Sequence, residues 1–289
     1  MIVPVDAEPH HDRTPTGFTF GLGLRAALAR ELFAQPDTCV DFLEIHPENY
    51  LGRGGHFRRM LDEARERWPM LVHGLSRSLA SPEAFDVDGL RSLRALLRDV
   101  KAPFYSDHLC LSSFGNAHSY DLLPMPFNEA WLKVSIDRVR QLQQALEIPI
   151  LVENVSSLFI LEGSEWSEPE FLSLLVQETG CGLLLDVNNV FVNATNHGVD
   201  PVDWLRRIPM HRVMAMHMAG HETRPDGILI DTHAEPVCAD VRQLFARVVQ
   251  SCPQVPVLLE RDGNYPPLTD LLHELDDLRS DVGQVNHAS

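Results

Sequence analysis

Short apolar runs in this sequence end repeatedly in side chains that can bind metals or carry protons. The pattern is clearest in GLLLDVNNVFV (182–192), where three leucines are followed by Asp186 and then by Asn188 and Asn189. Other runs end in the same way, at His73, His108, Glu153, His217 and Glu260. Imidazole nitrogens and carboxylate oxygens are common ligands of divalent metal ions. The pattern therefore predicts a metal site, provided that the fold brings the ends of these runs together.

A long segment after His217 adds more residues of the same kinds. AGHETRPDGILIDTH (219–233) contains His221 and then the pair Asp231 and His233. A buried site lined only by carboxylates would be unstable, because buried carboxylates repel one another and are costly to leave unpaired. Interleaved imidazoles and carboxylates instead suit a divalent metal ion.

One earlier run carries further candidates. CVDFLEIH (39–46) places Glu44 and His46 on one alternating face, and Glu48 continues it. Glu44 and Glu48 can equally be partners of nearby arginines. Even without them, the imidazoles and carboxylates exceed the needs of a single tetrahedral ion. We therefore expect two or three ions that share a bridging carboxylate.

The runs that carry these residues alternate with amphipathic segments along the whole chain. The predicted strands span 18–25, 39–46, 69–76, 102–109, 149–156, 181–188, 212–220 and 255–262. The predicted helices span 26–34, 57–68, 87–100, 128–146, 169–179, 201–208, 239–250 and 267–279. Strands joined by helices form a parallel sheet, because a tight turn cannot connect parallel neighbours. Eight such units predict a (β/α)8 TIM barrel in the α/β class.

No linker rich in Pro, Gly or Ser divides the chain, so we expect a single domain over residues 1–289. Its core should span about 17–279, with loose tails at 1–16 and 280–289. A doubly wound open sheet is the alternative, but GLGLR in the first predicted strand lacks its G-x-G-x-x-G spacing. In a barrel the carboxyl ends of the strands meet at one mouth. The candidate ligands would then form one cup.

Composition and charge exclude several classes of partner. The 289 residues contain 24 Lys and Arg against 41 Asp and Glu, a net charge of −17, whereas nucleic acids and anionic membranes attract basic surfaces. No apolar run reaches the ~18 residues of a membrane helix. The N-terminal segment does not resemble a signal peptide, and the five cysteines are scattered without a C-x-x-C pair. We expect a cytoplasmic protein that binds neither nucleic acid nor membranes, and a structural role for Cys110.

The order of the candidate ligands resembles the trinuclear metal cup of endonuclease IV and its xylose-isomerase-like barrel relatives. The matching residues are His73, His108, Glu153, Asp186, His217, Asp231, His233 and Glu260. The resemblance implies that Glu153 bridges two ions and that Asp231 and His233 serve the third. Three residues after Asp186, the endonuclease has a histidine ligand where this chain has Asn189. We therefore expect Asn189 to be a weak ligand of the third ion.

Longer motifs resemble the multinuclear non-heme iron-dependent oxidases, a barrel family typified by the methanobactin-biosynthesis oxidase. They are FLEIHPENYLG, SDHLCLS, SYDLLPMPFNEAWL, LVENVSS, LLLDVNNVFVNATNHG, HMAGH, LIDTHAEPV and LLERDGNYPPL. The resemblance implies two or three irons and dioxygen as co-substrate. It also implies a substrate cysteine in a ribosomally made precursor peptide, converted to an oxazolone–thioamide pair, a thiooxazole or a β-carbon-excised product. A small partner protein would recognise the peptide.

Residues beside the predicted ligands should orient them or contact the substrate. We expect this role for Asp107, Asn154, Asn188 and His221. The long segment LSSFGNAHSYDLLPMPF (111–127) should lie at the mouth and close over the peptide. Two alternatives stay open: a metal-dependent phosphodiesterase or sugar isomerase on the same barrel, and a non-catalytic metal-binding subunit. Asn189 and the charge of −17 both count against DNA as a substrate.

Overall fold

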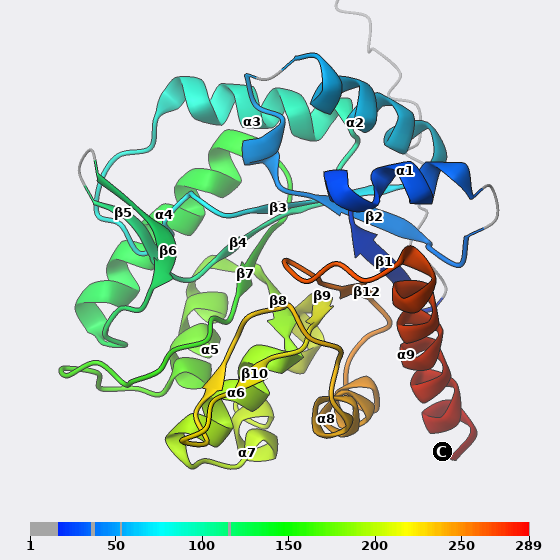
Figure 1. Cartoon of the computed structure of the whole chain (residues 1–289). Helices are drawn as coiled ribbons and strands as arrows, with labels where there is room; N and C mark the ends of the chain where they lie inside the picture. The colour runs from blue at the N-terminus through cyan, green and yellow to red at the C-terminus, as the bar shows by residue number, and fades with distance from the viewer. Residues whose placement is uncertain (1–16, 36–37, 53, 115–116, 289) are drawn as a thin grey trace, which may run out of the picture.

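Eight parallel strands form a closed barrel in this computed structural model, which describes residues 17–35, 38–52, 54–114 and 117–288 (Figure 1). The strands are β1 (Thr19–Gly23), β2 (Phe42–Ile45), β3 (Met70–Gly74), β4 (Tyr105–His108), β7 (Ile150–Glu153), β8 (Gly182–Asp186), β9 (Val213–Met218) and β12 (Pro256–Leu259). They follow one another around the barrel in chain order, and β12 pairs with β1 to close it. The predicted (β/α)8 barrel is confirmed. The expectation for residues 1–16 lies outside the described residues.

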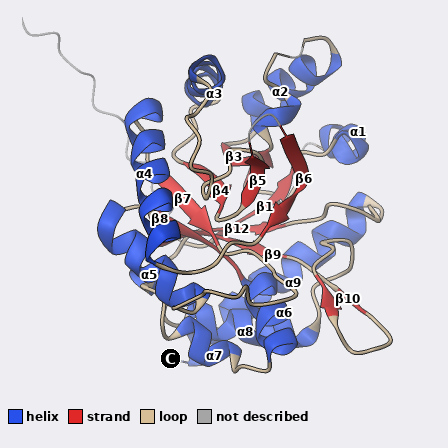
Figure 2. Cartoon of the chain, turned by 90° about the vertical axis from the view of Figure 1, so that its left-hand side faces the viewer, coloured by secondary structure: helices blue, strands red, loops and turns tan. Residues whose placement is uncertain are grey.

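Helices surround the barrel, as Figure 2 shows. They are α1 (Ala26–Ala34), α2 (His56–Arg67), α3 (Val87–Asp99), α4 (Glu129–Leu146), α5 (Glu168–Thr179), α6 (Val187–His197), α7 (Pro201–Leu205), α8 (Ala239–Val249) and α9 (Leu268–Ala288), with 3-10 turns η1 (Pro47–Asn49) and η2 (Met210–Arg212). Among these, α6 was not predicted. Within the described part of the chain, no helix is long and apolar enough to cross a membrane.

The expected loose tail from residue 280 is wrong, because α9 continues to Ala288. The reason is an apolar stripe that extends beyond the predicted helix end. Leu275, Leu278 and Val282 follow one another at helical spacing, and all three are buried. Burial of this stripe stabilises the last turns of the helix.

Two hairpins interrupt the alternation of strands and helices. After β4, strands β5 (Leu111–Phe114) and β6 (Ala117–Leu123) pair antiparallel, and Figure 1 shows this hairpin at the left of the molecule. After β9, strands β10 (Glu222–Thr223) and β11 (Leu229–Ile230) pair in the same way. Both hairpins follow the carboxyl end of a barrel strand, and the first lies in the segment that we expected at the mouth.

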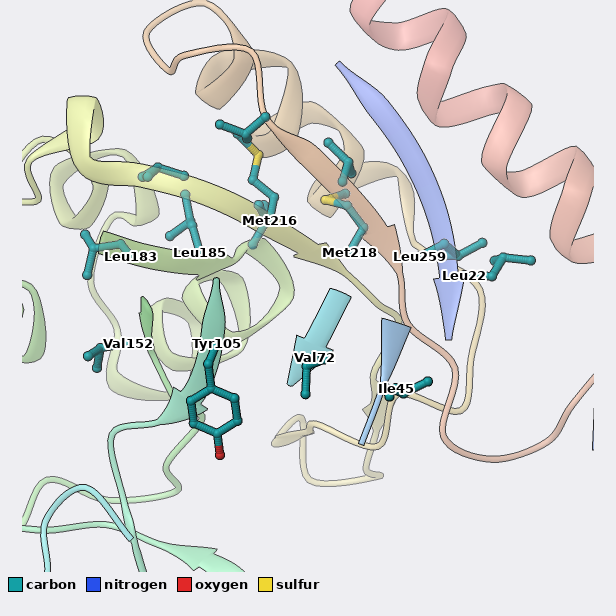
Figure 3. Close-up of a cluster of buried hydrophobic side chains, with 14 of the residues drawn as sticks. Leu22, Ile45, Val72, Tyr105, Val152, Leu183, Leu185, Met216, Met218 and Leu259 are labelled. Carbon is teal, nitrogen blue, oxygen red and sulfur yellow. The ribbon is translucent and has the colours of Figure 1, made fainter. Parts of the chain in front are cut away.

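The strands alternate between two apolar environments. Their outward side chains pack in the layer between barrel and helices, part of which Figure 3 shows: Leu22, Ile45, Val72, Tyr105, Val152, Leu183, Leu185, Met216, Met218 and Leu259. The alternate side chains form a second buried cluster inside the barrel: Phe42, Leu71, Phe104, Leu151, Leu184, Ala215 and Leu258. On β1 this inward position is Gly21, where a Cβ would lie 2.4 Å from the Phe42 ring.

The inner apolar cluster forms the floor of the site. Each residue of this cluster is followed, two positions later in the chain, by a polar or charged residue. These residues are Glu44, His73, Ser106, Glu153, Asp186, His217 and Glu260. Because side chains two residues apart in a strand point to the same face, these groups point into the barrel directly above the apolar floor. The barrel therefore gathers six metal-competent side chains from six different strands at one mouth.

Candidate metal centre

The first group of donors joins β3, β4 and β7. His73 Nε2 lies 3.3 Å from His108 Nε2, and these two atoms lie 3.2 and 3.1 Å from Glu153 Oε2. His73 Nδ1 contacts Ser106 Oγ at 2.9 Å, which fixes the ring and leaves Nε2 directed at the group. Two imidazole nitrogens and one carboxylate oxygen thus converge on one point, as the ligands of a metal ion do.

The second group shares Glu153 with the first. Its members are Glu153, Asp186, His217 and Glu260, all buried. His217 Nδ1 lies 2.9 Å from Glu260 Oε2 and 3.3 Å from Glu153 Oε1. The two oxygens of Glu153 are therefore divided: Oε2 faces the first group and Oε1 the second. This division is the geometry that a bridging carboxylate needs.

The third group includes the residues that follow β9 in the chain. His233 Nε2 lies 2.8 Å from Asp231 Oδ1 and 3.7 Å from Asp186 Oδ2. Its other nitrogen, Nδ1, lies 3.1 Å from Glu260 Oε2. The predicted pair of Asp231 and His233 therefore reaches the cup from its rim, and Asp186 and Glu260 connect it to the second group.

The unpredicted helix α6 holds two of the donors. Asp186 is its N-cap: the backbone N–H of Asn189 donates to Asp186 Oδ1 at 2.6 Å, an arrangement typical of helix starts. Asn189 Nδ2 in turn donates to the Asn154 carbonyl at 3.1 Å, so Asn189 Oδ1 is free to accept. Strand β8 ends in an aspartate and two amides because a helix begins there.

Several buried acceptor atoms in the cup lack a hydrogen-bond partner within the described part of the chain. They are Asp186 Oδ2, Asn189 Oδ1 and Glu44 Oε1. Leaving such an atom unpaired costs about 1–3 kcal/mol, and a bound cation would satisfy it. Nitrogen and oxygen donors suit hard or borderline divalent ions. The residues of the cup therefore fit a group of metal ions.

The acid–base state of the cup differs between its parts. Burial raises the pKa of Glu153 to about 7 and that of Asp186 well above its usual value. Burial also lowers the pKa of His73 and His108, which favours their neutral, metal-binding form. For His233, burial acts in the same direction, but Asp231 and Glu260 outweigh it and raise the pKa well above its usual value. A metal ion would have to displace the proton that His233 holds.

The four expected supporting residues divide into two kinds. Asn188 and His221 lie at the rim: Asn188 Nδ2 donates to Asp231 Oδ1 at 2.7 Å, and His221 Nδ1 donates to Asn188 Oδ1 at 2.8 Å. Asn154 lies between β7 and β8, where it exchanges two 2.9 Å hydrogen bonds with the backbone of Asp186. These contacts position ligand-bearing residues.

Asp107 lies elsewhere. It occupies the face of β4 opposite to His108, because neighbouring residues of a strand alternate. There Asp107 Oδ2 accepts from Tyr105 Oη at 2.5 Å and from the Arg77 backbone N–H at 3.3 Å. Asp107 Oδ1 also accepts from the backbone N–H of His108 at 2.9 Å. Asp107 thus supports the start of the β3–α3 connection and the backbone of one donor residue. Cys110 is buried, which raises its thiol pKa well above the usual value.

The structure adds residues to the site that the sequence did not assign. Glu44 Oε2 lies 3.3 Å from His217 Nε2, and its place on the alternating face of β2 was the available signal. Arg25 lies 3.5 Å from Glu260 Oε1 and 2.7 Å from Asp262 Oδ1. No sequence pattern pointed to Arg25, because its contacts are with residues more than 230 positions away.

Known proteins resemble this chain at two levels. UPF0276 proteins of Pseudomonas aeruginosa and Caulobacter vibrioides are 42% and 40% identical to it, each over 90% of this chain and over 90% and 93% of their own length. Among solved structures, a D-tagatose 3-epimerase-like protein has a TM-score of 0.61 at 14% identity, with 94% of this chain and 99% of that chain covered.

A second solved structure is a xylose isomerase-like TIM barrel protein from Mycobacterium smegmatis in complex with magnesium. It has a TM-score of 0.58 at 13% identity, with 93% of this chain and 97% of that chain covered. At such identities the two structures establish the fold alone. A family model, described as RiPP precursor modification enzyme MbnB/TglH/ChrH, matches residues 19–282. Together with the expected family motifs along the same residues, this match shows that the chain belongs to the MbnB/TglH/ChrH family of RiPP precursor modification enzymes.

Proposed function

We propose that this chain is an iron-dependent oxidase that uses O2 to modify cysteine in a ribosomally synthesised precursor peptide. The observation that carries the proposal is the division of Glu153 between two groups of buried donors. Membership in a family of precursor-modifying enzymes supports a peptide as the substrate. Two or three irons would bind to His73, His108, Glu153, Asp186, Asn189, His217, Asp231, His233 and Glu260.

Iron bound in the cup would supply the redox chemistry with dioxygen. The chain's own residues then have three tasks. Buried imidazoles and carboxylates neutralise the ionic charge, and the apolar floor excludes water from below. Asn154 and Asn188 orient ligand-bearing residues through the hydrogen bonds described above. Cys110 is buried and its thiol pKa is raised, which does not suit a reacting thiol, and we assign the reacting thiol to the substrate.

The rim of the mouth offers a place for the peptide. Exposed apolar side chains follow several barrel strands: Leu75 after β3, Leu123 in β6, Leu158, Phe159 and Ile160 after β7, and Tyr265 after β12. Exposed apolar groups on the connections that follow the strands would favour binding of a partner chain. We propose that the peptide, presented by a small partner protein, docks here, and that the β5–β6 hairpin contacts it. The five free cysteines support a cytoplasmic location.

Oxygen uptake tests the proposal. The protein is purified without oxygen, loaded with ferrous iron and mixed with the proposed partner protein and with a cysteine-containing precursor peptide. We expect two or three irons per chain, O2 uptake that depends on the peptide, and a change in peptide mass. Peptides with each cysteine replaced by serine should support neither O2 uptake nor a change in peptide mass. Equal modification of the serine peptides, or zinc-supported turnover of a phosphodiester or sugar without O2, would reject the oxidase.

A further inference from the structure

A further group of residues with the donor types of a cation site lies beside the cup. His46, Glu260 and Asp262 place one ligand atom each within 4.8 Å of the others. His46 Nδ1 lies 3.1 Å from the His73 carbonyl, and because a carbonyl only accepts, Nδ1 must carry the proton. The other nitrogen of His46, Nε2, is then an acceptor. Two carboxylates and a neutral imidazole are a donor set that would suit a divalent ion.

The guanidinium group of Arg25 is paired with the two carboxylates of this group. Arg25 Nη2 lies 2.7 Å from Asp262 Oδ1 and 3.5 Å from Glu260 Oε1. The Arg25 side chain is 10% exposed and that of Glu260 is 5% exposed, so solvent screens this pair weakly. Glu260 Oε2, the other oxygen, lies 2.9 Å from His217 Nδ1. Glu260 thus faces Arg25 with one oxygen and the cup with the other.

The backbone of β1 makes room for this guanidinium. A Cβ built on Gly23 would lie 2.7 Å from Arg25 Nη1 and 2.8 Å from its Cζ. A side chain at position 23 would overlap the guanidinium where it now lies, so the guanidinium would have to shift. Gly23 and Arg25 therefore belong to one arrangement, in which a permanently charged group is held against Glu260 and Asp262.

We propose that Arg25 is an internal cation that keeps metal ions from binding to the group formed by His46, Glu260 and Asp262. The inference rests on the proposed metal cup only in that Glu260 belongs to both. By neutralising Glu260 and Asp262, Arg25 confines metal binding to the side of Glu260 that faces His217. It is therefore a residue that determines how many ions the mouth of the barrel holds.

Ion positions in matched variants test the inference. Arg25→Met removes the charge and keeps much of the side-chain length, whereas Arg25→Lys keeps the charge. Full-length protein is loaded with Mn2+ alone, without peptide or O2, and anomalous diffraction locates the ions while elemental analysis counts them. We expect Arg25→Met to hold one ion more than the wild type, between His46 and Asp262. Arg25→Lys should lack that ion, and Asp262→Asn in the Arg25→Met background should remove it.

Absence of an ion between His46 and Asp262 in folded Arg25→Met protein would overturn the inference. Should circular dichroism show that this variant does not fold, Gly23→Ala gives a second test, because it keeps the charge but displaces the guanidinium. Partial occupancy of the same position in Gly23→Ala supports the inference, and an empty position contradicts it. A wild-type cup that holds no ions with Mn2+, and none when the loading is repeated with Fe2+ under anaerobic conditions, would refute the proposed oxidase, yet the difference between the variants and the wild type would still decide the role of Arg25.

Discussion

The two ends of the cup are built differently. His73 and Glu153, at the strand-borne end, have side chains 1% exposed, and burial lowers the pKa of His73 well below its usual value. Asp231 and His233, at the loop-borne end, have side chains 14% and 12% exposed, and neighbouring carboxylates overcome burial to raise the pKa of His233. His73 is therefore already in its neutral, metal-binding form, whereas His233 must lose a proton first. We therefore expect the third ion to be the weakest.

Replacing Glu153 should have the largest effect. Glu153→Gln removes one negative charge and one oxygen ligand shared by two donor groups, so we expect the variant to lose more than one ion per chain. Elemental analysis of protein loaded with ferrous iron measures the loss. Glu168→Gln is a matched control, because burial also raises the pKa of Glu168 to about 7 but its carboxylate accepts from the Val155 N–H outside the cup. Full metal content in Glu153→Gln would contradict bridging.

Lowering the pH should release metal ions from the two ends of the cup to different extents. Without metal, the cup binds protons at Glu153, with a pKa of about 7, and at His233, with a pKa raised well above its usual value by Asp231 and Glu260. Each proton that a metal displaces weakens binding about tenfold per pH unit below the pKa of its group. We expect ion retention to fall as the pH drops through 7, with the third ion lost first. Dialysis from pH 8 to pH 6 followed by ion counting measures this, and a flat profile contradicts the comparison.

Changing Asn189 should have the smallest effect. The Asn189 amide is a weaker ligand than imidazole, so Asn189→His should raise occupancy of the ion served by Asp231 and His233 by several-fold. Occupancy of the other ions should not change, because Asn189 belongs to neither of the first two groups. Anomalous diffraction from Mn2+-loaded crystals compares the positions. Unchanged occupancy of the third position, with the barrel intact, would count against Asn189 as its ligand.

The sequence alone determined the barrel and most of the cup. A strand places every second side chain on one face, and parallel strands in a closed barrel end at one mouth. An ionisable residue two positions beyond an inward apolar residue must therefore point into that mouth, as His73, Glu153, Asp186 and His217 do. These relations depend only on local periodicity and on the number of repeating units, which the sequence displays.

Only the tertiary structure decided the details that depend on contacts across the fold. The start of α6 at Val187 follows from a side-chain cap by Asp186, whereas the sequence pattern predicted a strand that continued to residue 188. Asp107 adjoins His108 in the sequence, and only the structure showed that its carboxylate accepts from Tyr105 Oη and from the His108 backbone N–H. The pairing of Arg25 with Glu260 and Asp262 joins the first strand to the last. Such a contact arises only when β12 closes the barrel against β1, since no local pattern records which distant charge a guanidinium will meet.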